Sequence, residues 1–475
     1  MVDIKLDIKD RNVAKSYAHF DRRVTFAEVE HLVTNKDFVS HYAFYPLIQR
    51  DLRRMKPDGS GGFKNDPREI RYAAHMDRCI YQYYAALLNE RYNVLAADCG
   101  IDESSIAYRT NLKGKSNCDF ARIAFDRIRE LGTCCVYAGD FWHFFETLSH
   151  RNLKRRVRLL FNDGVIPDDY YHVLKNATRY SVWPIEDLLE RHGLPLSKTG
   201  VKRLNQRLRV LSPNEFKDNV KKMASRPWKE NGGVGIPQGL PISGVLANVY
   251  MIEFDRKAHD LATSIGGMYL RYSDDFIFIF PRPEDLIEVM AKVAKLAVDA
   301  GVTIHADKTY ACICKPGLVV QAPGFGVAAG HPRHQIDYLG FTYDGTCVRL
   351  RQRTIGRYYR RMYHRIGWMY GDANRPSRKR FYSLYVDFAN HGRRPGKNER
   401  VRKLLGKRGM HGNFLTYVDR AQRVFPHDPI TRDTDRHMQK IRKRCKAVSR
   451  KSQLGRRQLH GAPVVAKVAI RETGL

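Results

Sequence analysis

Several common features are missing from this chain of 475 residues. No run of eighteen apolar residues occurs, which excludes an ordinary transmembrane helix. The N-terminal stretch MVDIKLDIKDRNVAKSY is charged from its third residue and has no apolar core, so a signal peptide is not expected. None of the nine cysteines forms the C-x2-C pair of a structural zinc site. We therefore expect a cytoplasmic protein with reduced core thiols and no membrane partner.

Acidic residues are scarce relative to basic ones. The 83 Lys and Arg residues outnumber the 50 Asp and Glu residues, which gives a formal net charge of +33. Residues 351–475 alone hold 33 basic and 8 acidic residues, with aromatic residues interleaved, as in RYYRRMYHRIGWMY (357–370). Cations mixed with aromatic rings suit phosphates and stacked bases better than a membrane surface, where one face should be apolar. This basic C-terminal region therefore predicts a nucleic-acid partner.

The pattern of apolar residues predicts a mixed fold. Apolar residues at a spacing of three to four predict a helix over 71–93, and GTCCVYAGDF (132–141) has the composition of a strand. Further along, we expect helices alternating with turns at about 144–227, a Gly/Pro loop that runs into an apolar helix at 235–255, and a helix at 283–301. We also expect a hairpin of strands 268–272 and 276–280, and strands near 302–305, 310–314 and 336–343. This order predicts an α+β fold, an antiparallel sheet with helices on one face and the other face open to a ligand.

Two adjacent aspartates, Asp274 and Asp275, stand in the turn of the predicted hairpin YLRYSDDFIFIF. Neighbouring anions without a basic residue in the turn attract a divalent cation, and hard oxygen ligands favour Mg²⁺ or Mn²⁺; an ordinary polar turn is the alternative. Asp140 ends another apolar strand and is the best third ligand, with a helix N-cap as its alternative. Asp168 and Asp169 instead open a helix, where carboxylates favour the positive end of the dipole, so we assign them no chemistry.

Five blocks of the sequence resemble those of reverse transcriptases. YAGDFWHFFETLSH resembles their first catalytic block, and GIPQGLPISGVLANVYM resembles the Q-G-x-x-x-S block. YSDD is similar to the Y-x-D-D hairpin, HADKT to the lysine block, and IDYLGF to the primer-grip turn. In addition to these five blocks, two segments that precede them, REIRYAAHMDRCIYQ and AYRTNLKGKSN, resemble the fingers. A single Y-x-D-D motif would be weak, but five blocks in the family's order are specific.

The resemblance implies a right-hand polymerase with fingers, an antiparallel-sheet palm and a helical basic thumb. The expected domains are an N-terminal extension (1–66), fingers (67–130), a palm (131–345) with a helical finger insertion at about 150–234, a thumb (346–395) and a basic helical C-terminal region (396–475).

The resemblance also implies an RNA-directed DNA polymerase that uses two Mg²⁺ ions, or Mn²⁺, for phosphoryl transfer. The metal ligands would be Asp140, Asp274, Asp275 and the backbone carbonyl of Phe141. Lys308 would protonate pyrophosphate or place a cation near it, with a solvated strand-end lysine as the alternative.

Other residues are implied in nucleotide and primer binding. Arg71 and Arg109 would clamp the triphosphate. Phe145 would be the ribose gate that favours deoxynucleotides, although Phe144 is adjacent and either ring could be a core residue. Gln238 and Gly239 would open the loop under the new base pair. Ser243 would belong to this loop or cap the helix that follows, and the primer grip would comprise Tyr338, Leu339 and Gly340.

The C-terminal region narrows the type of reverse transcriptase by elimination. Residues 351–475 offer no acidic cluster for an RNase H domain and no cysteine pair of an intron-encoded tail. The remaining likeness is to bacterial defence-associated or abortive-infection enzymes. The implied partners are an RNA template, of the structured non-coding kind, dNTPs and a DNA product, with a second protein or a homo-oligomer left open. The alternatives are a retron-like or intron-like enzyme and a non-catalytic RNA-binding scaffold.

Overall fold

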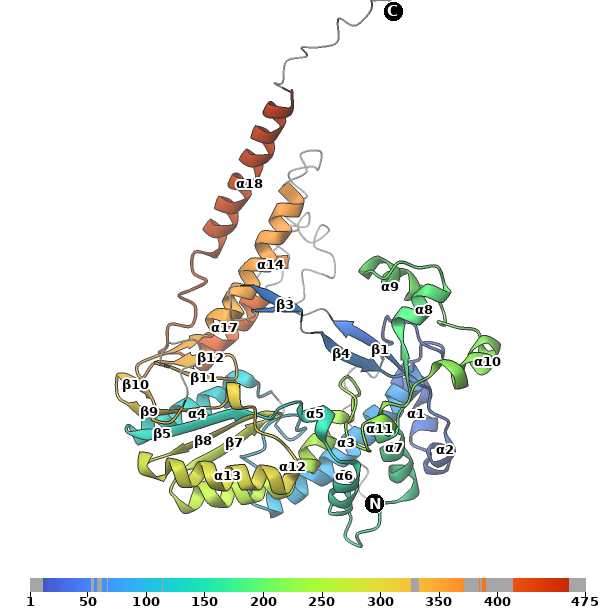
Figure 1. Cartoon of the computed structure of the whole chain (residues 1–475), viewed down its shortest axis with the longest axis horizontal. Coiled ribbons are helices and arrows are strands. Elements are labelled where there is room, and N and C mark those ends of the chain that lie inside the picture. Colours follow the sequence, from blue (N-terminus) through green and yellow to red (C-terminus); the bar gives the residue numbers. More distant parts are fainter. Residues whose placement is uncertain are drawn as a thin grey trace, which may run out of the picture. The chain divides into compact units, whose positions relative to one another are not determined.

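The computed structural model describes residues 12–52, 55–57, 62–65, 67–112, 114–325, 333–370, 384, 387–389 and 413–460. These residues form two compact units (Figure 1), the first within 1–115 and 127–334 and the second within 116–126 and 335–475. No helix in the described ranges combines the length and the hydrophobicity that a bilayer crossing needs. All nine cysteines are free thiols and seven of them are buried.

The first unit is built on a five-stranded sheet with the order β10-β9-β5-β8-β7. Its strands are β5 (Cys134–Asp140), β7 (Met268–Tyr272), β8 (Asp275–Phe280), β9 (Tyr310–Lys315) and β10 (Leu318–Gln321). Every neighbouring pair is antiparallel. The predicted α+β fold with an antiparallel sheet is therefore confirmed.

Strand β8 of this sheet is buried more completely than the sequence suggested. The helices α12 (Ser243–Ser264) and α13 (Leu286–Ala300) lie along the sheet and contact β7, β8 and β5 (Figure 1). Successive residues of β8, from Phe276 to Phe280, are all buried, so both faces of this strand are covered. The expected open ligand face is wrong at this strand, because a strand that is apolar at every position must be buried on both sides.

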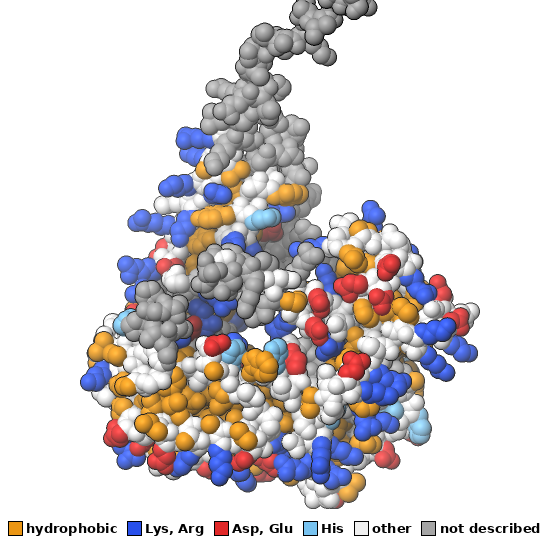
Figure 2. Space-filling model, in the orientation of Figure 1, with side chains coloured by type: hydrophobic (Ala, Val, Ile, Leu, Met, Phe, Trp, Pro, Cys, Tyr) orange, Lys and Arg blue, Asp and Glu red, His pale blue; other side chains and the backbone are white. Residues whose placement is uncertain are grey.

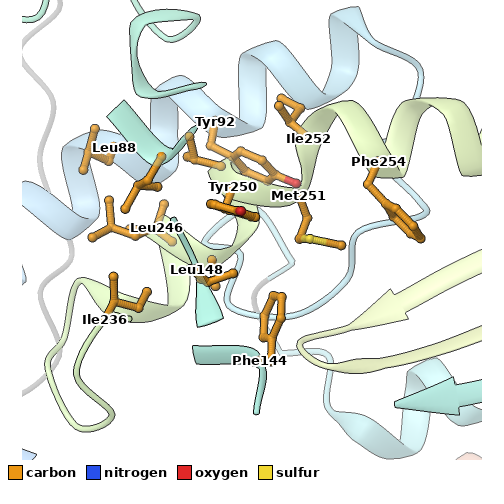
Figure 3. Close-up of a cluster of buried hydrophobic side chains, with 14 of the residues drawn as sticks. Leu88, Tyr92, Phe144, Leu148, Ile236, Leu246, Tyr250, Met251, Ile252 and Phe254 are labelled. Atoms are coloured by element: carbon orange, nitrogen blue, oxygen red, sulfur yellow. The ribbon is translucent and has the colours of Figure 1, made fainter. Parts of the chain in front are cut away.

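The apolar core joins α12 to α3 (His75–Asp98) and to the loops around them. Figure 3 shows this cluster, which includes Leu88, Tyr92, Phe144, Leu148, Ile236, Leu246, Tyr250, Met251, Ile252 and Phe254. Helix α12 buries residues on several sides, as an apolar helix between other elements must. The segment expected as a strand at 302–305 makes only an isolated bridge between Ile304 and Phe141.

A second sheet of the first unit has the order β4-β1-β6. Strand β1 (Leu47–Leu52) pairs antiparallel with β4 (Arg68–Tyr72) and parallel with β6 (Val182–Pro184). This sheet therefore joins three segments that the sequence analysis assigned to different regions: the N-terminal extension, the fingers and the helical insertion. Because β4 takes up Arg71 and Tyr72, helix α3 starts at His75 instead of residue 71. A separate core that includes Trp183 lies under this sheet.

The remaining helices and strands of the first unit are short. They are α1 (Phe26–Val33), α2 (Lys36–His41), β2 (Met55–Pro57), β3 (Phe63–Asn65), α5 (Phe144–Thr147), α6 (His150–Arg158), α7 (Asp168–Thr178), α8 (Ile185–Arg191), α9 (Lys198–Leu204), α10 (Pro213–Met223), α11 (Pro227–Glu230) and the 3-10 turns η1 (Pro283–Asp285) and η2 (Ala306–Lys308).

The second unit contains the antiparallel sheet β11 (Ile336–Tyr338), β12 (Phe341–Tyr343) and β13 (Val348–Leu350). Its helices are α14 (Gln352–Tyr370), α17 (Phe414–Val424), α18 (His437–His460) and the first part of α4 (Asn117–Leu131). Helices α14 and α18 pack against each other. The β11–β12 hairpin thus groups with the helices that follow it, while the boundary expected between the thumb (346–395) and the C-terminal region (396–475) lies outside the described residues.

Candidate active site

An acidic edge forms where strands β5 and β8 end. Their antiparallel register places Asp140 directly opposite Asp275. Directly opposed residues have Cα atoms about 4.5–5.5 Å apart. The backbone N–H of Phe141 donates to the carbonyl of Asp274 at 3.0 Å, which ties the end of β5 to the hairpin turn. The structure therefore brings together the three aspartates that the sequence singled out, although Asp140 is far from the other two in the chain.

The turn that carries Asp274 is a two-residue connection between β7 and β8. Ser273 has a φ of +62°, the left-handed value that such tight hairpins require at a central position. The hydroxyl of Tyr108 donates to Ser273 Oγ at 3.3 Å, and the Arg271 guanidinium donates to the Ser273 carbonyl at 2.9 Å. The turn is therefore held from two sides.

Arg271 lies beneath the turn and was not predicted from the sequence. Its side chain and that of Asp255 are both fully buried, and their ion pair measures 2.6 Å. Arg271 also donates to Ser105 Oγ at 3.1 Å and, more weakly, to Asn248 Oδ1 at 3.4 Å. The available signal was a charged residue within the apolar strand MYLRY. This network connects the hairpin turn to α12 and to the loop at 104–107, whose backbone also pairs with Arg271.

The acidic edge has one electrostatic feature that favours a divalent cation, its neighbouring carboxylates, and one that opposes it, a lysine paired with Asp140. Burial, followed by the charge of Asp140, raises the pKa of Asp274 above its ordinary value, because two nearby carboxylates disfavour each other's ionisation. The Lys308 ammonium donates to Asp140 Oδ2 at 2.8 Å and provides one opposing charge. Among the described residues, no three acidic, histidine or cysteine side chains converge closely enough to surround a metal ion. The chemistry of the three carboxylates fits Mg²⁺, and Lys308 neutralises one of them in this conformation.

Four of the predicted nucleotide-binding residues meet at a loop. The N–H of Arg71 donates to the carbonyl of Gln238 at 2.9 Å, and the N–H of Ile236 donates to the carbonyl of Phe145 at 2.8 Å. Gly239 has a φ of +119°, and a Cβ atom there would lie 2.3 Å from the carbonyl oxygen of Arg71. Only glycine allows this approach. The side chain of Gln238 is held by two residues that the sequence did not indicate, Arg68 and Glu146, each at 2.7 Å.

The two adjacent phenylalanines have different environments. Phe144 is 3% exposed and packs in the core (Figure 3), whereas Phe145 is only partly buried. Phe145 is therefore the ring that remains accessible beside the Gln238 loop. Ser243 donates its hydroxyl to the Pro237 carbonyl at 2.7 Å and makes no helix cap, so its side chain closes the loop.

The prediction for Arg109 is wrong. Its side chain has no exposed surface and forms an ion pair with Asp102. It also donates to Asn93 Oδ1 at 2.9 Å and to the carbonyl of Ser105 at 3.2 Å, and it lies over the ring of Tyr92. A guanidinium with these partners braces its own loop and cannot reach a triphosphate. Arg71 is less constrained, although it pairs with Glu69 and Gln49.

The predicted primer-grip residues form the β11–β12 turn of the second unit. Leu339 has a φ of +47° and Gly340 a φ of +94°. The amide of Asn117 donates to the Leu339 carbonyl at 2.9 Å, which fixes the turn against α4. Tyr338 is buried. Their role in holding a primer stays a prediction.

Comparisons with known proteins find similarity in the part of the chain that carries most of the motifs. Residues 220–343 match the family model described as reverse transcriptase (RNA-dependent DNA polymerase). This range includes Gln238, Asp274, Asp275, Lys308 and the primer-grip turn, and it begins after Asp140. Residues 220–343 are therefore similar to reverse transcriptases.

A curated relative and several solved structures are similar to parts of the chain. The retron Mx162 reverse transcriptase of Myxococcus xanthus is 26% identical over 174 residues, which is 33% of this chain and 34% of that protein. The match thus spans about a third of the relative's length. Apo telomerase from Candida tropicalis superposes with a TM-score of 0.37 at 14% identity, over 93% of this chain and 70% of that one. The same enzyme with a fragment of telomeric RNA has a TM-score of 0.37 at 14% identity, over 90% and 63% of the two chains.

Proposed function

We propose that the protein is an RNA-directed DNA polymerase that copies a dedicated structured non-coding RNA in bacterial antiphage defence. The main support for the polymerase activity is the register of β5 and β8, which places Asp140 opposite Asp275 and therefore near Asp274. Nucleotide addition is phosphoryl transfer, in which positioning and charge neutralisation supply most of the catalysis.

The residues of this edge would have different roles in catalysis. Asp140, Asp274 and Asp275 would hold two Mg²⁺ ions, with the carbonyl of Phe141 as a further ligand. When bound, the ions supply charge that activates the primer hydroxyl and stabilises the leaving pyrophosphate. Lys308 is already placed at Asp140 and would carry a proton or a positive charge to the pyrophosphate.

The loop around Gln238 would bind the incoming nucleotide. Its backbone is fixed by Arg71, and Gly239 allows a base pair to approach closely. Phe145 would exclude a ribose 2′-hydroxyl. The excess of basic residues supports an RNA partner, because phosphate contacts supply most of the affinity for nucleic acids. A second protein or a second copy of the chain would complete the assembly if one is required.

The defence role is supported by elimination alone. The few acidic residues of 351–475 leave no basis for an RNase H domain, and Cys445 is the only cysteine in this region. RNA sequencing of the nucleic acid that copurifies with the protein from its bacterial host tests the role. One structured transcript in excess is the expected result, whereas a random sample of cellular RNA would contradict it.

A primer-extension assay tests the activity. Purified protein with Mg²⁺ and an RNA template with an annealed primer should incorporate dNTPs, and incorporation should require the RNA. Preferential use of NTPs, or incorporation without a template, would contradict the proposal. RNA binding without any incorporation would favour the second candidate, a non-catalytic scaffold, which is supported by the Lys308–Asp140 ion pair because it neutralises a metal ligand.

Replacing Phe145 by alanine should weaken discrimination against ribonucleotides. The ring is partly exposed beside the Gln238 loop, and its removal opens space for a 2′-hydroxyl. The ratio of kcat/KM for dNTP over NTP should fall by about tenfold or more, since a steric contact of this size is worth about 1–3 kcal/mol. The Phe145→Tyr variant keeps the ring and should keep the ratio. An unchanged ratio in Phe145→Ala would remove Phe145 from the gate.

A further inference from the structure

Helix α6 carries a row of basic side chains that the proposed catalysis does not use. Arg151, Arg155 and Arg158 are exposed, and Lys154 is partly exposed. The three arginines have the spacing i, i+4 and i+7, so they share one face of the helix. At a rise of 1.5 Å per residue they extend over about 10 Å. This is a linear array of cations on a short, fixed element.

Helix α12 continues the array, because it packs beside α6 and exposes Arg256 and Lys257. Two hollows adjoin here. One, of about 470 Å³, is lined by Arg151, Asn152, Lys154, Arg155 and Arg158. The other, of about 350 Å³, is lined by Arg155, Arg156, Glu253, Phe254, Arg256, Lys257, Leu296, Asp299 and Ala300. Arg155 lines both hollows, and we call them together the basic groove.

The charges of the basic groove are strongly unbalanced. Its lining includes seven cationic side chains and two carboxylates, those of Glu253 and Asp299. Glu253 pairs with Arg155 at 2.9 Å and with Arg156 at 3.2 Å, so it offers little to compensate the other cations. The net charge of the lining is therefore +5. Figure 2 shows Lys and Arg side chains gathered on the lower rim of this face, where Figure 1 places α6.

Buried contacts hold part of the groove in place. Arg156 is almost fully buried, lies 4.4 Å from the centre of the Tyr250 ring, and pairs with Glu253. Glu253 in turn holds the exposed Arg155. Lys154 lies 4.2 Å from the centre of the Tyr171 ring. Side chains that are positioned before binding lose less conformational entropy when a ligand arrives.

We propose that the basic groove binds the phosphate backbone of a structured RNA at a site that shares no lining residue with the acidic edge. The inference rests on the proposed function for the identity of the polyanion. A concave groove with cations along its walls fits a ridge of phosphates, whereas a flat membrane surface would reach only the rim. The groove would anchor a stem of the RNA while another part of the molecule serves as template.

Binding of a fluorescent RNA hairpin, measured by anisotropy over a series of salt concentrations and without nucleotides, tests this inference. The triple variant Arg151→Gln, Arg158→Gln, Lys257→Gln should bind at least about tenfold more weakly than the wild type. The slope of log K against log[salt] should also decrease in magnitude by about 2–3, roughly one for each lost phosphate contact. The triple variant Lys217→Gln, Lys221→Gln, Lys222→Gln on exposed α10 removes the same charge and should change both quantities much less.

The outcomes separate this inference from the proposed function. The triple variant at Arg151, Arg158 and Lys257 lies on α6 and α12. If it folds normally, as its melting temperature would show, and keeps the wild-type affinity and salt slope, the groove does not bind RNA and this inference is overturned. Equal losses in the α10 variant would also overturn it, because they would show a general charge effect. Loss of binding to vesicles of phosphatidylcholine and phosphatidylserine, with RNA binding intact, would assign the groove to membranes and overturn it. Groove-dependent RNA binding without primer extension would overturn the proposed polymerase alone.

Discussion

Replacing Asp140 or Asp275 by asparagine should reduce RNA-templated dNTP incorporation by about 10³-fold or more. Each substitution removes a charged oxygen ligand, and a metal ion contributes several kcal/mol of charge stabilisation to phosphoryl transfer. The two residues face each other across β5 and β8, so both variants should lose the same activity. The rate of primer extension at saturating dNTP is the measurement.

The stability of these variants should change little. Asp140 is 13% exposed and is paired with Lys308, which is 51% exposed, so water reaches the pair and its contribution should be about 1 kcal/mol. The matched control is Asp168→Asn, because Asp168 also belongs to an adjacent pair of aspartates but lies exposed at the start of α7. It should keep full activity. Retained activity in Asp140→Asn, or unfolding of both variants at the temperature of the assay, would refute the catalytic assignment.

The features that could be predicted from sequence are those set by local pattern. The apolar runs on either side of SDD define the β7–β8 hairpin, and the strand before Asp140 ends where its apolar run ends. Strand pairing then brings the ends together, so the acidic edge follows from a few short segments. The approach of Gly239 to the carbonyl of Arg71 was not anticipated, because the sequence does not show which segment packs against this loop.

The features that could not be predicted depend on partners that are distant or locally ambiguous. Arg109 is held by Asp102 and Asn93, and nothing in the sequence distinguishes this brace from a phosphate-binding arginine. Strand β6 joins β1 across more than a hundred residues, so a three-residue strand in a helical stretch gave no signal. Segment 302–305 has strand composition, but it pairs with residues 140–142 only through one isolated bridge and two backbone hydrogen bonds, because β5 ends at Asp140.

The buried ion pair of Arg271 and Asp255 shows the same limit and leads to the second large effect. Replacing Arg271 by methionine should destabilise the fold by about 3–5 kcal/mol, because Asp255 would remain buried without a counter-charge. Replacing both residues, as Arg271→Met with Asp255→Leu, should restore most of that stability, since apolar pairs often replace buried ion pairs without loss. Thermal or denaturant unfolding measures both values.

Activity should not recover with stability in the double variant. Arg271 donates to the carbonyl of Ser273, and this contact fixes the turn that presents Asp274 and Asp275. Without it the carboxylates are less well positioned, so kcat should stay at least about tenfold below the wild type, since a displacement of about 1 Å can cost a factor of 10². The Mg²⁺ concentration for half-maximal rate should rise, while KM for dNTP should change less. If the role of Arg271 were purely structural, kcat and the Mg²⁺ requirement would return to wild-type values once stability is restored.

The exposed ion pair of Lys292 and Glu288 on α13 provides the matched control. The double variant Lys292→Gln, Glu288→Gln should change stability by less than about 1 kcal/mol and leave kcat unaltered. If the Arg271→Met, Asp255→Leu protein is as stable and as active as this control, the buried pair serves the fold alone. If it is as stable but slow and requires more Mg²⁺, Arg271 positions the acidic edge through the carbonyl of Ser273.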